Sequence, residues 1–214
     1  MDFTARGVAV DTLAGSSKNL FSRAIGIVRT FFGIRTYGRV RLRFLKNFFL
    51  ATHPDKRVFR GALAATILEQ CKAKGYTLAC AESCTGGLIS AALTDISGSS
   101  TVFTHGFITY ANQAKIMMLG VSAEDIEKFG AVSETIARQM AEGARRVSGA
   151  DIAVATTGIA GPSGGTPQKP VGLVFVAVAT LEKTVVEQLQ LKGNRQEIRG
   201  QTVEYALKML QQFI

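Results

Sequence analysis

The chain has 214 residues, 47% of them hydrophobic, which is enough for one substantial core or for one domain with an appendage. Its net charge of +9 comes from residues 1–60, which hold 12 Lys and Arg residues against 3 Asp and Glu residues. Residues 61–214 hold 13 basic and 13 acidic residues, so the main domain lacks the excess of positive charge that is typical of nucleic-acid binding. Two histidines and three cysteines without zinc-ligand spacing argue against a histidine-rich metal site and favour a reducing, cytoplasmic location.

The basic segment, residues 1–57, is rich in Arg and Phe and poor in acids. Basic residues interrupt its apolar runs well before the roughly 18 residues that a membrane span needs, so no transmembrane helix is predicted. Three interpretations stay open: an amphipathic membrane-surface or targeting segment, a segment that contacts nucleic acid, or a start codon assigned too far upstream. We expect it to be disordered and residues 58–214 to form the functional domain.

The main domain begins with a predicted helix that Gly75 can end. An apolar run over 76–80 then predicts a strand, and the spacing over 88–93 predicts a second helix directly after a tight turn. Four apolar residues mark the buried face of the first helix: Leu63, Ile67, Leu68 and Cys71.

The middle of the chain predicts one strand and three helices. The strand spans 102–110, and a short helix follows over 112–119. Ser122 and Asp125 are spaced as a capping box at the start of the next helix, and Ser133 begins a longer helix over 133–147.

The last part of the chain predicts three strands and a helix. The run over 151–157 is continuously apolar, as in a strand covered on both faces, and leads into a glycine-rich loop at 158–167 that is suited to function. Further strands are predicted over 171–179 and 184–191, and a helix over 195–213. Because helices alternate with apolar strands, we predict an α/β fold, a three-layer α/β/α sandwich around a mixed, largely buried sheet.

The stretch 79–87 lies between a predicted strand and a predicted helix. Because the first N–H groups of a helix lack partners within it, and glycines let a ligand approach, this junction predicts an anion or oxyanion site. Ser83, Cys84 and Thr85 add hydroxyl and thiol groups that suit chemistry. The alternative is a structural turn, in which Ser83 caps the helix and Cys84 fills apolar space.

Six blocks of residues follow one another in a specific order: Ala81 to Gly87, Gly98 to Ser100, Tyr110 to Lys115, Gly130 to Glu134, Thr157 to Gly165 and Lys169 to Gly172. They resemble the motif series of the CinA C-terminal domain family, whose stand-alone members include nicotinamide mononucleotide deamidases. The resemblance covers roughly residues 61–214. The basic segment has no counterpart in it, and the large N-terminal domain of full-length CinA proteins, with its pyrophosphatase activity, is not matched.

The resemblance implies hydrolysis of the carboxamide of nicotinamide mononucleotide to nicotinate mononucleotide and ammonia, with no metal and no organic cofactor. Such a reaction needs a nucleophile, a base, oxyanion donors and an acid for the departing ammonia. By resemblance, Ser83 is the nucleophile and Lys115 the base, with Tyr110 beside them. His105, the only histidine of the main domain, has no obvious partner, and Lys115 serves only if burial or nearby cations lower its pKa.

The remaining expected site residues bind the substrate. Arg195 and Arg199 lie on one face at the start of the last helix and could bind the phosphate, or they could be ordinary surface residues. Lys115 and Tyr110 likewise have plain alternatives as a solvated lysine and a packing residue. The substrate-binding set is Thr85, Gly86, Ser100, Thr157, Gly158, Arg195 and Arg199.

A second hypothesis is a non-catalytic nucleotide-binding regulatory module associated with competence and damage response. Ligand binding without turnover distinguishes it from the amidase. The resemblance further suggests a homodimer or a higher homo-oligomer. The sequence does not separate nicotinamide mononucleotide from related pyridine amides, nor does it say which arginine meets the phosphate.

Overall fold

The computed structural model describes residues 56–214, with side chains from Arg60 onward. The expectations for the basic segment, residues 1–57, therefore lie outside the described residues, except for the backbone of residues 56 and 57. Six α-helices, one short 3₁₀ helix and five strands make up this part. In chain order they are α3 Lys56–Lys74, β1 Leu78–Glu82, α4 Leu88–Thr94, η1 Ser99–Thr101, β2 Phe103–Ile108, α5 Asn112–Leu119, α6 Ala123–Phe129, α7 Glu134–Ser148, β3 Ile152–Gly158, β4 Leu173–Ala179, β5 Thr184–Gln190 and α8 Arg195–Gln211.

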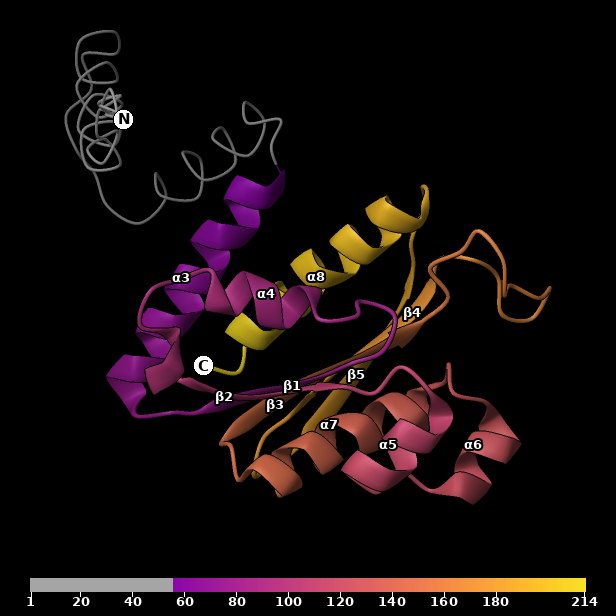
Figure 1. Cartoon of the computed structure of the whole chain (residues 1–214), viewed down its shortest axis with the longest axis horizontal. Helices are drawn as coiled ribbons and strands as arrows, with labels where there is room; N and C mark the ends of the chain where they lie inside the picture. The colour runs from indigo at the N-terminus through magenta and orange to yellow at the C-terminus, as the bar shows by residue number, and fades with distance from the viewer. Residues whose placement is uncertain (1–55) are drawn as a thin grey trace, which may run out of the picture. The chain divides into compact units, whose positions relative to one another are not determined.

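The strands form one mixed sheet in the order β2-β1-β3-β4-β5. Strand β1 is parallel to both of its neighbours, whereas β4 and β5 run antiparallel to the strands before them. Figure 1 shows α3, α4 and α8 on one face of the sheet and α5, α6 and α7 on the other. The predicted three-layer α/β/α sandwich is thereby confirmed.

Strand β3 shows how the sequence builds both layers. Successive side chains of a strand point to opposite faces, so Val154 packs toward α3 and α8 while Ala153 and Ala155 face α7. The face toward α7 carries small alanines, which lets this helix lie close to the sheet. The continuous apolar run therefore reflects burial on both faces, as expected for a central strand.

Helix α7 also lies close to α5. A Cβ added to Gly143 of α7 would stand 2.2 Å from the carbonyl oxygen of Leu119 at the end of α5. Only a glycine permits this approach, because a β-carbon cannot come so near to a backbone oxygen. The contact matters for the site, since α5 carries Lys115.

Two local predictions differ from the structure. The first strand continues to Glu82, two residues beyond the predicted end, because β1 is central and its pairing with β3 persists to that residue. Ser122 does cap α6 by accepting from Asp125 N, but its own N–H donates to Gln139 of α7, so the reciprocal half of the capping box comes from another helix. The cap by Ser133 on α7 is confirmed.

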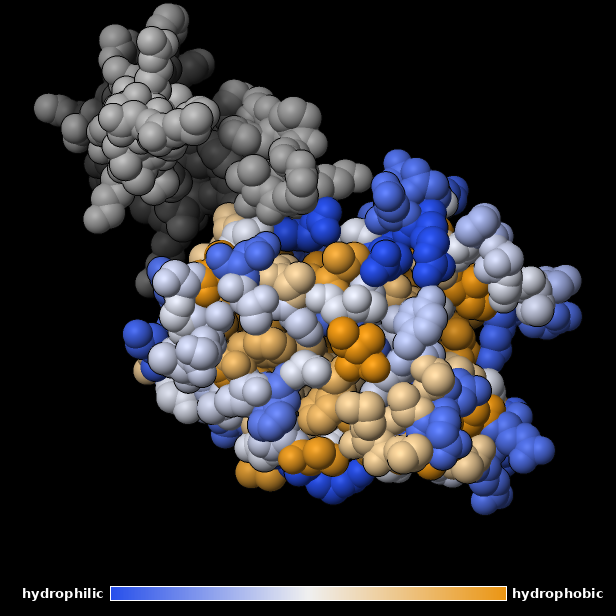
Figure 2. All heavy atoms as spheres, in the orientation of Figure 1, coloured by the Kyte–Doolittle hydropathy of each residue, from blue (hydrophilic) through white to orange (hydrophobic). Residues whose placement is uncertain are grey.

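Parallel pairing decides where the site lies. Because β1, β2 and β3 run in the same direction, the residues that follow them meet at one edge of the sheet, the usual place for a site in α/β proteins. Figure 2 shows apolar side chains exposed over the ends of β1 and β2 and over α5. Within the described residues, no helix is both long enough and apolar enough to cross a bilayer.

Candidate active site

Ser83 and Lys115 meet at the carboxyl end of β1. The Nζ atom of Lys115 lies 3.2 Å from Ser83 Oγ, and it donates to the carbonyl oxygens of Thr109 at 2.8 Å and Tyr110 at 3.4 Å. Lys115 is only 1% exposed and Ser83 9%. Lys115 is therefore no solvated surface lysine, although it lies on a short helix at the edge of the domain.

Burial shifts the protonation equilibrium of Lys115 toward the neutral amine. Burial lowers the pKa of the ammonium group, and the nearby Cys84 thiol opposes this effect. The three acceptors around Nζ are a hydroxyl and two carbonyl oxygens, all of them uncharged. A neutral amine beside a serine hydroxyl can take its proton, which is the property that the sequence analysis required of a base.

The predicted anion site at the start of α4 is already filled by the chain itself. The carboxylate of Glu82, fully buried, accepts from the N–H groups of Gly87, Ile89 and Ser90. These are amides that the sequence analysis assigned to a ligand. The expectation of a ligand-binding helix start at α4 is thus corrected, because an internal carboxylate occupies it.

The turn that holds Ser83 is pinned from several sides. Ser83 N donates to the Thr156 carbonyl, and Gly86 N closes the turn onto the Ser83 carbonyl. Arg199 donates to the Cys84 carbonyl at 3.1 Å and the Thr85 carbonyl at 2.7 Å. Within the described backbone network, the N–H groups of Cys84 and Thr85 donate to no carbonyl.

Cys84 is buried, and its surroundings raise the pKa of its thiol. Burial raises the pKa of its thiol to about 12, with Glu82 adding to the effect. A thiolate is the nucleophilic form of cysteine, and it is scarce at neutral pH for such a group. The interpretation of Cys84 as apolar filling beside Ser83 therefore fits its surroundings.

Three expected substrate-binding residues serve the scaffold in this structure. Thr85 pairs with the hydroxyl of Thr156 at 2.8 Å, and Thr157 donates to the Ala131 carbonyl at 2.8 Å. Gly158 lies so close to β4 that an added Cβ would stand 2.8 Å from a backbone oxygen there. Thr85, Thr157 and Gly158 therefore hold the turn, the end of β3 and a neighbouring loop together. Gly86 has a left-handed φ of 58° that its place in the turn requires.

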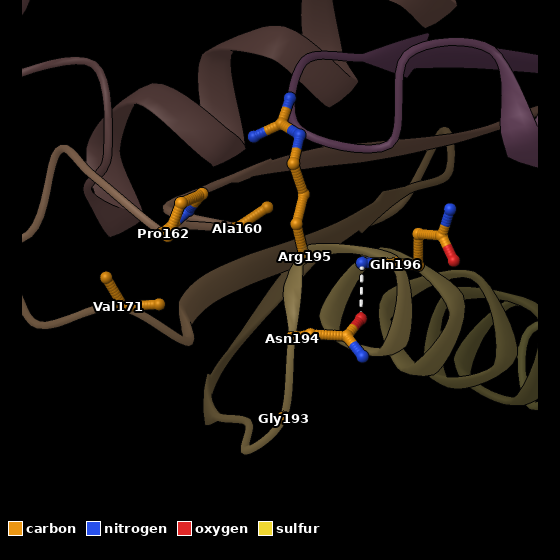
Figure 3. Close-up of a pocket in the computed structure, with 7 residues that line it drawn as sticks. All are labelled: Ala160, Pro162, Val171, Gly193, Asn194, Arg195 and Gln196. Atoms are coloured by element: carbon orange, nitrogen blue, oxygen red, sulfur yellow. Dashed lines mark hydrogen bonds between the residues drawn. The ribbon is translucent and has the colours of Figure 1, made fainter.

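Arg195 and Tyr110 lie at the open side of the site. Arg195 donates to the Gly161 carbonyl at 2.9 Å and to the Tyr110 hydroxyl at 3.0 Å, and Tyr110 is 60% exposed. A pocket of about 390 Å³ adjoins Arg195, between the loop after β3 and the start of α8. Figure 3 shows the Arg195 side chain extending away from Val171 and Gly193. Neither Ser83 nor Lys115 lines this pocket, so Arg195 is the link between pocket and site.

Within one chain, Ser100 lies far from the other expected site residues. It lies in η1, directly before β2, and β2 begins opposite Leu78 at the amino end of β1. Ser83 follows the other end of β1, so the two serines are separated by more than roughly 13 Å of strand. Ser100 is exposed and far from Lys115 within this chain.

Four further residues support the site, although they were not predicted from the sequence. Glu82 and Thr156 hold the turn, and Thr109 supplies a carbonyl to Lys115 while its own buried hydroxyl has no partner among the described residues. Lys169 donates to the carbonyls of Phe129 and Val132 and so ties two motif blocks together. Glu82 and Lys169 both lie within the motif blocks, and Glu82 is also a lone acid in a run of small residues, whereas Thr109 and Thr156 left no signal in the sequence.

The fold and these contacts define a class of protein: an α/β/α domain with a buried serine–lysine pair at the carboxyl ends of parallel strands. No group of three or more His, Cys, Asp or Glu side chains is placed to share a metal ion in residues 56–214. A family model described as the CinA C-terminal domain matches residues 60–214. The chain belongs to this family, as the motif blocks predicted.

Several bacterial proteins are similar to this chain. A putative competence-damage inducible protein of Acetivibrio thermocellus is 54% identical over 138 residues, which are 64% of this chain and 33% of that protein. A CinA-like protein of Syntrophus aciditrophicus is 47% identical over 161 residues, 75% of this chain and 37% of that protein. The chain thus spans about a third of the length of these relatives.

Solved structures agree with this assignment. The competence/damage inducible protein CihA from Agrobacterium tumefaciens superposes with a TM-score of 0.71 at 46% identity, covering 74% of this chain and 96% of that one. A CinA superfamily protein from Escherichia coli gives a TM-score of 0.70 at 32% identity, covering 72% of this chain and 90% of that one. The α/β fold is therefore shared with these proteins.

Proposed function

We propose that the domain is an amidohydrolase that converts nicotinamide mononucleotide and water to nicotinate mononucleotide and ammonia. The observation that carries the proposal is the buried contact between Ser83 Oγ and Lys115 Nζ at 3.2 Å. Serine beside a lysine of lowered pKa is an established variant of the acyl-transfer site. The choice of substrate rests on the motif resemblance, since the names of the relatives state no activity.

In the proposed reaction, Ser83 Oγ attacks the carboxamide carbon while its proton passes to Lys115 Nζ. The resulting tetrahedral oxyanion accepts hydrogen bonds from the N–H groups of Cys84 and Thr85. Lys115 then returns the proton to the amide nitrogen, which leaves as ammonia and leaves an ester on Ser83. Water attacks this ester with Lys115 again as base, and nicotinate mononucleotide departs with Ser83 restored.

The phosphate of the nucleotide is assigned to Arg195 rather than Arg199. Arg199 is held by two carbonyls of the turn, so its role is to position that turn. Arg195 is exposed, borders the 390 Å³ pocket and contacts Tyr110, so it can meet an anion without giving up a buried bond. A pocket of this size suits part of a nucleotide.

The test is ammonia release from nicotinamide mononucleotide by the purified full chain. We expect Ser83→Ala and Lys115→Ala to reduce the rate by at least about 10³-fold, as for loss of a nucleophile or its base. The exposed residues Ser97 and Lys72 provide matched controls, because Ser97→Ala and Lys72→Ala remove the same groups away from the site. Wild-type rates in either site variant would contradict the assigned roles.

The second candidate is a nucleotide-binding module without catalysis. It is favoured by the names of the relatives, which refer to competence and damage instead of a reaction. Calorimetry on the same protein separates the two proposals. Saturable binding of the nucleotide with no ammonia release over hours would support the binding module.

A further inference from the structure

Glu82 is a buried acid that the proposed reaction does not use. It is the last residue of β1, directly before Ser83, and its side chain is fully buried. Oε2 accepts from Gly87 N at 2.9 Å and Ile89 N at 3.1 Å, and Oε1 accepts from Ser90 N and Ser90 Oγ, both at 2.8 Å. The Cys80 thiol lies 3.6 Å from Oε1 as a fifth donor. None of these donors is a lysine or an arginine.

Every group that faces the Glu82 side chain in these contacts is a hydrogen-bond donor. A carboxylate only accepts hydrogen bonds, so these donors match it. Burial, and next the charge of Glu82, raises the pKa of the Cys80 thiol, which keeps its proton available as a donor. The start of α4 adds a favourable dipole. Gly87, at the N-cap of α4, has a φ of 95° and no capping side chain, so Glu82 supplies the cap from the preceding strand.

The Glu82 cap also fixes the turn that contains Ser83. Glu82 is joined to Ser83 through the chain, and its carboxylate is bound to residues on the far side of the turn, so the turn is held at both ends. Arg199 holds the turn's carbonyls separately. The carboxylate also occupies the amides of α4, whereas the oxyanion donors of the proposed reaction, the N–H groups of Cys84 and Thr85, donate to no carbonyl.

We propose that Glu82 is a positioning residue, whose hydrogen-bonded carboxylate fixes Ser83 Oγ against Lys115 Nζ and orients the oxyanion donors of the turn. This inference rests on the proposed role of Ser83 as nucleophile, but not on the identity of the substrate. A plain helix cap would affect stability alone. A positioning residue must also set the reactivity of Ser83 in protein that remains folded.

The experiment measures the reaction of the full chain with phenylmethanesulfonyl fluoride, in which Ser83 Oγ displaces fluoride from sulfur and the intact mass reports the adduct. Glu82→Gln keeps the shape of the side chain, but its amide NH₂ must face donors. We expect its labelling rate at Ser83, corrected for the folded fraction, to fall at least tenfold. In parallel, kcat for ammonia release falls similarly while KM stays within about twofold.

Matched variants separate the positioning of Ser83 by Glu82 from the loss of a single hydrogen bond and from an effect of the Glu82 charge on Lys115. Ser90→Ala removes one hydroxyl donor and leaves the carboxylate and the three amides, so we expect less than about a threefold effect. Ser83→Ala must take no label. The pH midpoint of labelling, which reports Lys115, should stay in place for Glu82→Gln, because Glu82 is not among the causes of the lowered Lys115 pKa. A midpoint displaced by a full unit would mean that Glu82 acts through charge, against the proposal.

The outcomes distinguish this inference from the proposed function. Labelling of the wild-type chain that is lost in Glu82→Gln, without any ammonia release, retains the inference and overturns the substrate. Equal labelling of both chains overturns the inference whatever the substrate, and so does a wild-type chain that takes no label. If Glu82→Gln does not fold, the decision passes to Glu82→Asp, which keeps the charge but withdraws it by one methylene. Wild-type labelling of folded Glu82→Asp, or failure of both variants to fold, overturns the inference.

Discussion

At the scale of one residue, the burial of Lys115 suits its proposed role as a base but lowers the stability of the folded chain. Its amine is buried beside Ser83, and burial lowers its pKa from the ordinary 10.5. Between the lowered pKa and 10.5, the unfolded chain holds one proton more than the folded chain, so the free energy of unfolding rises with pH in that window. The neutral base also becomes more populated with rising pH, so the rate should rise through the same lowered pKa.

Replacing Lys115 by methionine tests this account. Lys115→Met keeps an unbranched side chain and removes the buried amine, so we expect a higher midpoint of thermal unfolding at pH 7 and no ammonia release. The pH dependence of stability contributed by this residue should disappear as well. Thermal melts from pH 6 to 9 measure both effects, and a lower midpoint than wild type throughout would contradict the destabilising role of the buried amine.

Cys84, next to the proposed nucleophile Ser83, is expected to have no chemical role. With its pKa raised to about 12 by burial, its thiol stays protonated at neutral pH. We expect Cys84→Ala to retain ammonia release within about threefold while losing about 1 kcal/mol of stability from the small cavity. Wild-type protein should also resist iodoacetamide at pH 8. Activity lost in the variant or on alkylation of Cys84 would return the cysteine to the list of nucleophiles.

At the scale of elements, the packing of α5 on α7 determines where Lys115 lies. Gly143 allows this packing, because a Cβ there would meet the Leu119 carbonyl at 2.2 Å. We expect Gly143→Ala to cost about 1–3 kcal/mol through overpacking and to lower the rate as α5 shifts. Chemical denaturation and ammonia release measure the two effects.

Gly61 provides the matched control for this helix contact. It lies within α3, and an added Cβ there would meet nothing within 4 Å. We therefore expect Gly61→Ala to stabilise the protein by about 0.5–1 kcal/mol and to leave the rate unchanged. Equal losses in both variants would show that the close contact of α5 with α7 is not what matters.

At the scale of the whole molecule, residues Pro54–Ile214 form one compact unit that contains every site contact described above. We expect a chain that begins at Pro54 to release ammonia at the rate of the full chain, because the partners given above for Ser83, Lys115 and Arg195 all belong to that unit. Side-by-side kinetics measure this. A large loss of kcat would assign residues 1–53 a part in the reaction.

The oligomeric state and the cellular location of the protein remain predictions. The homodimer or higher homo-oligomer suggested by the resemblance is measured by light scattering on the purified chain. Four large exposed apolar residues come from β2, α5 and the link between them: Ile108, Tyr110, Met117 and Met118. A cytoplasmic location is still an inference from the unpaired cysteines, and the described cysteines are all free.

The sequence by itself determined the elements and the candidate pair. Apolar spacing, the cap by Ser133 and the continuous run of β3 are local patterns, so the α/β sandwich could be predicted before any contact was known. The motif blocks likewise selected Ser83 and Lys115. A missed local signal was the full capping box of Asn194 and Glu197 at the start of α8.

The tertiary structure alone decided what each side chain does. Arg199 binds carbonyls in a turn 114 and 115 residues away, and Ser100 lies at the far end of β2 because that strand is parallel to β1. Glu82 fills the helix start that had been assigned to a ligand. These outcomes depend on strand order and register, which arise from packing between distant segments. Local propensity carries no information about them.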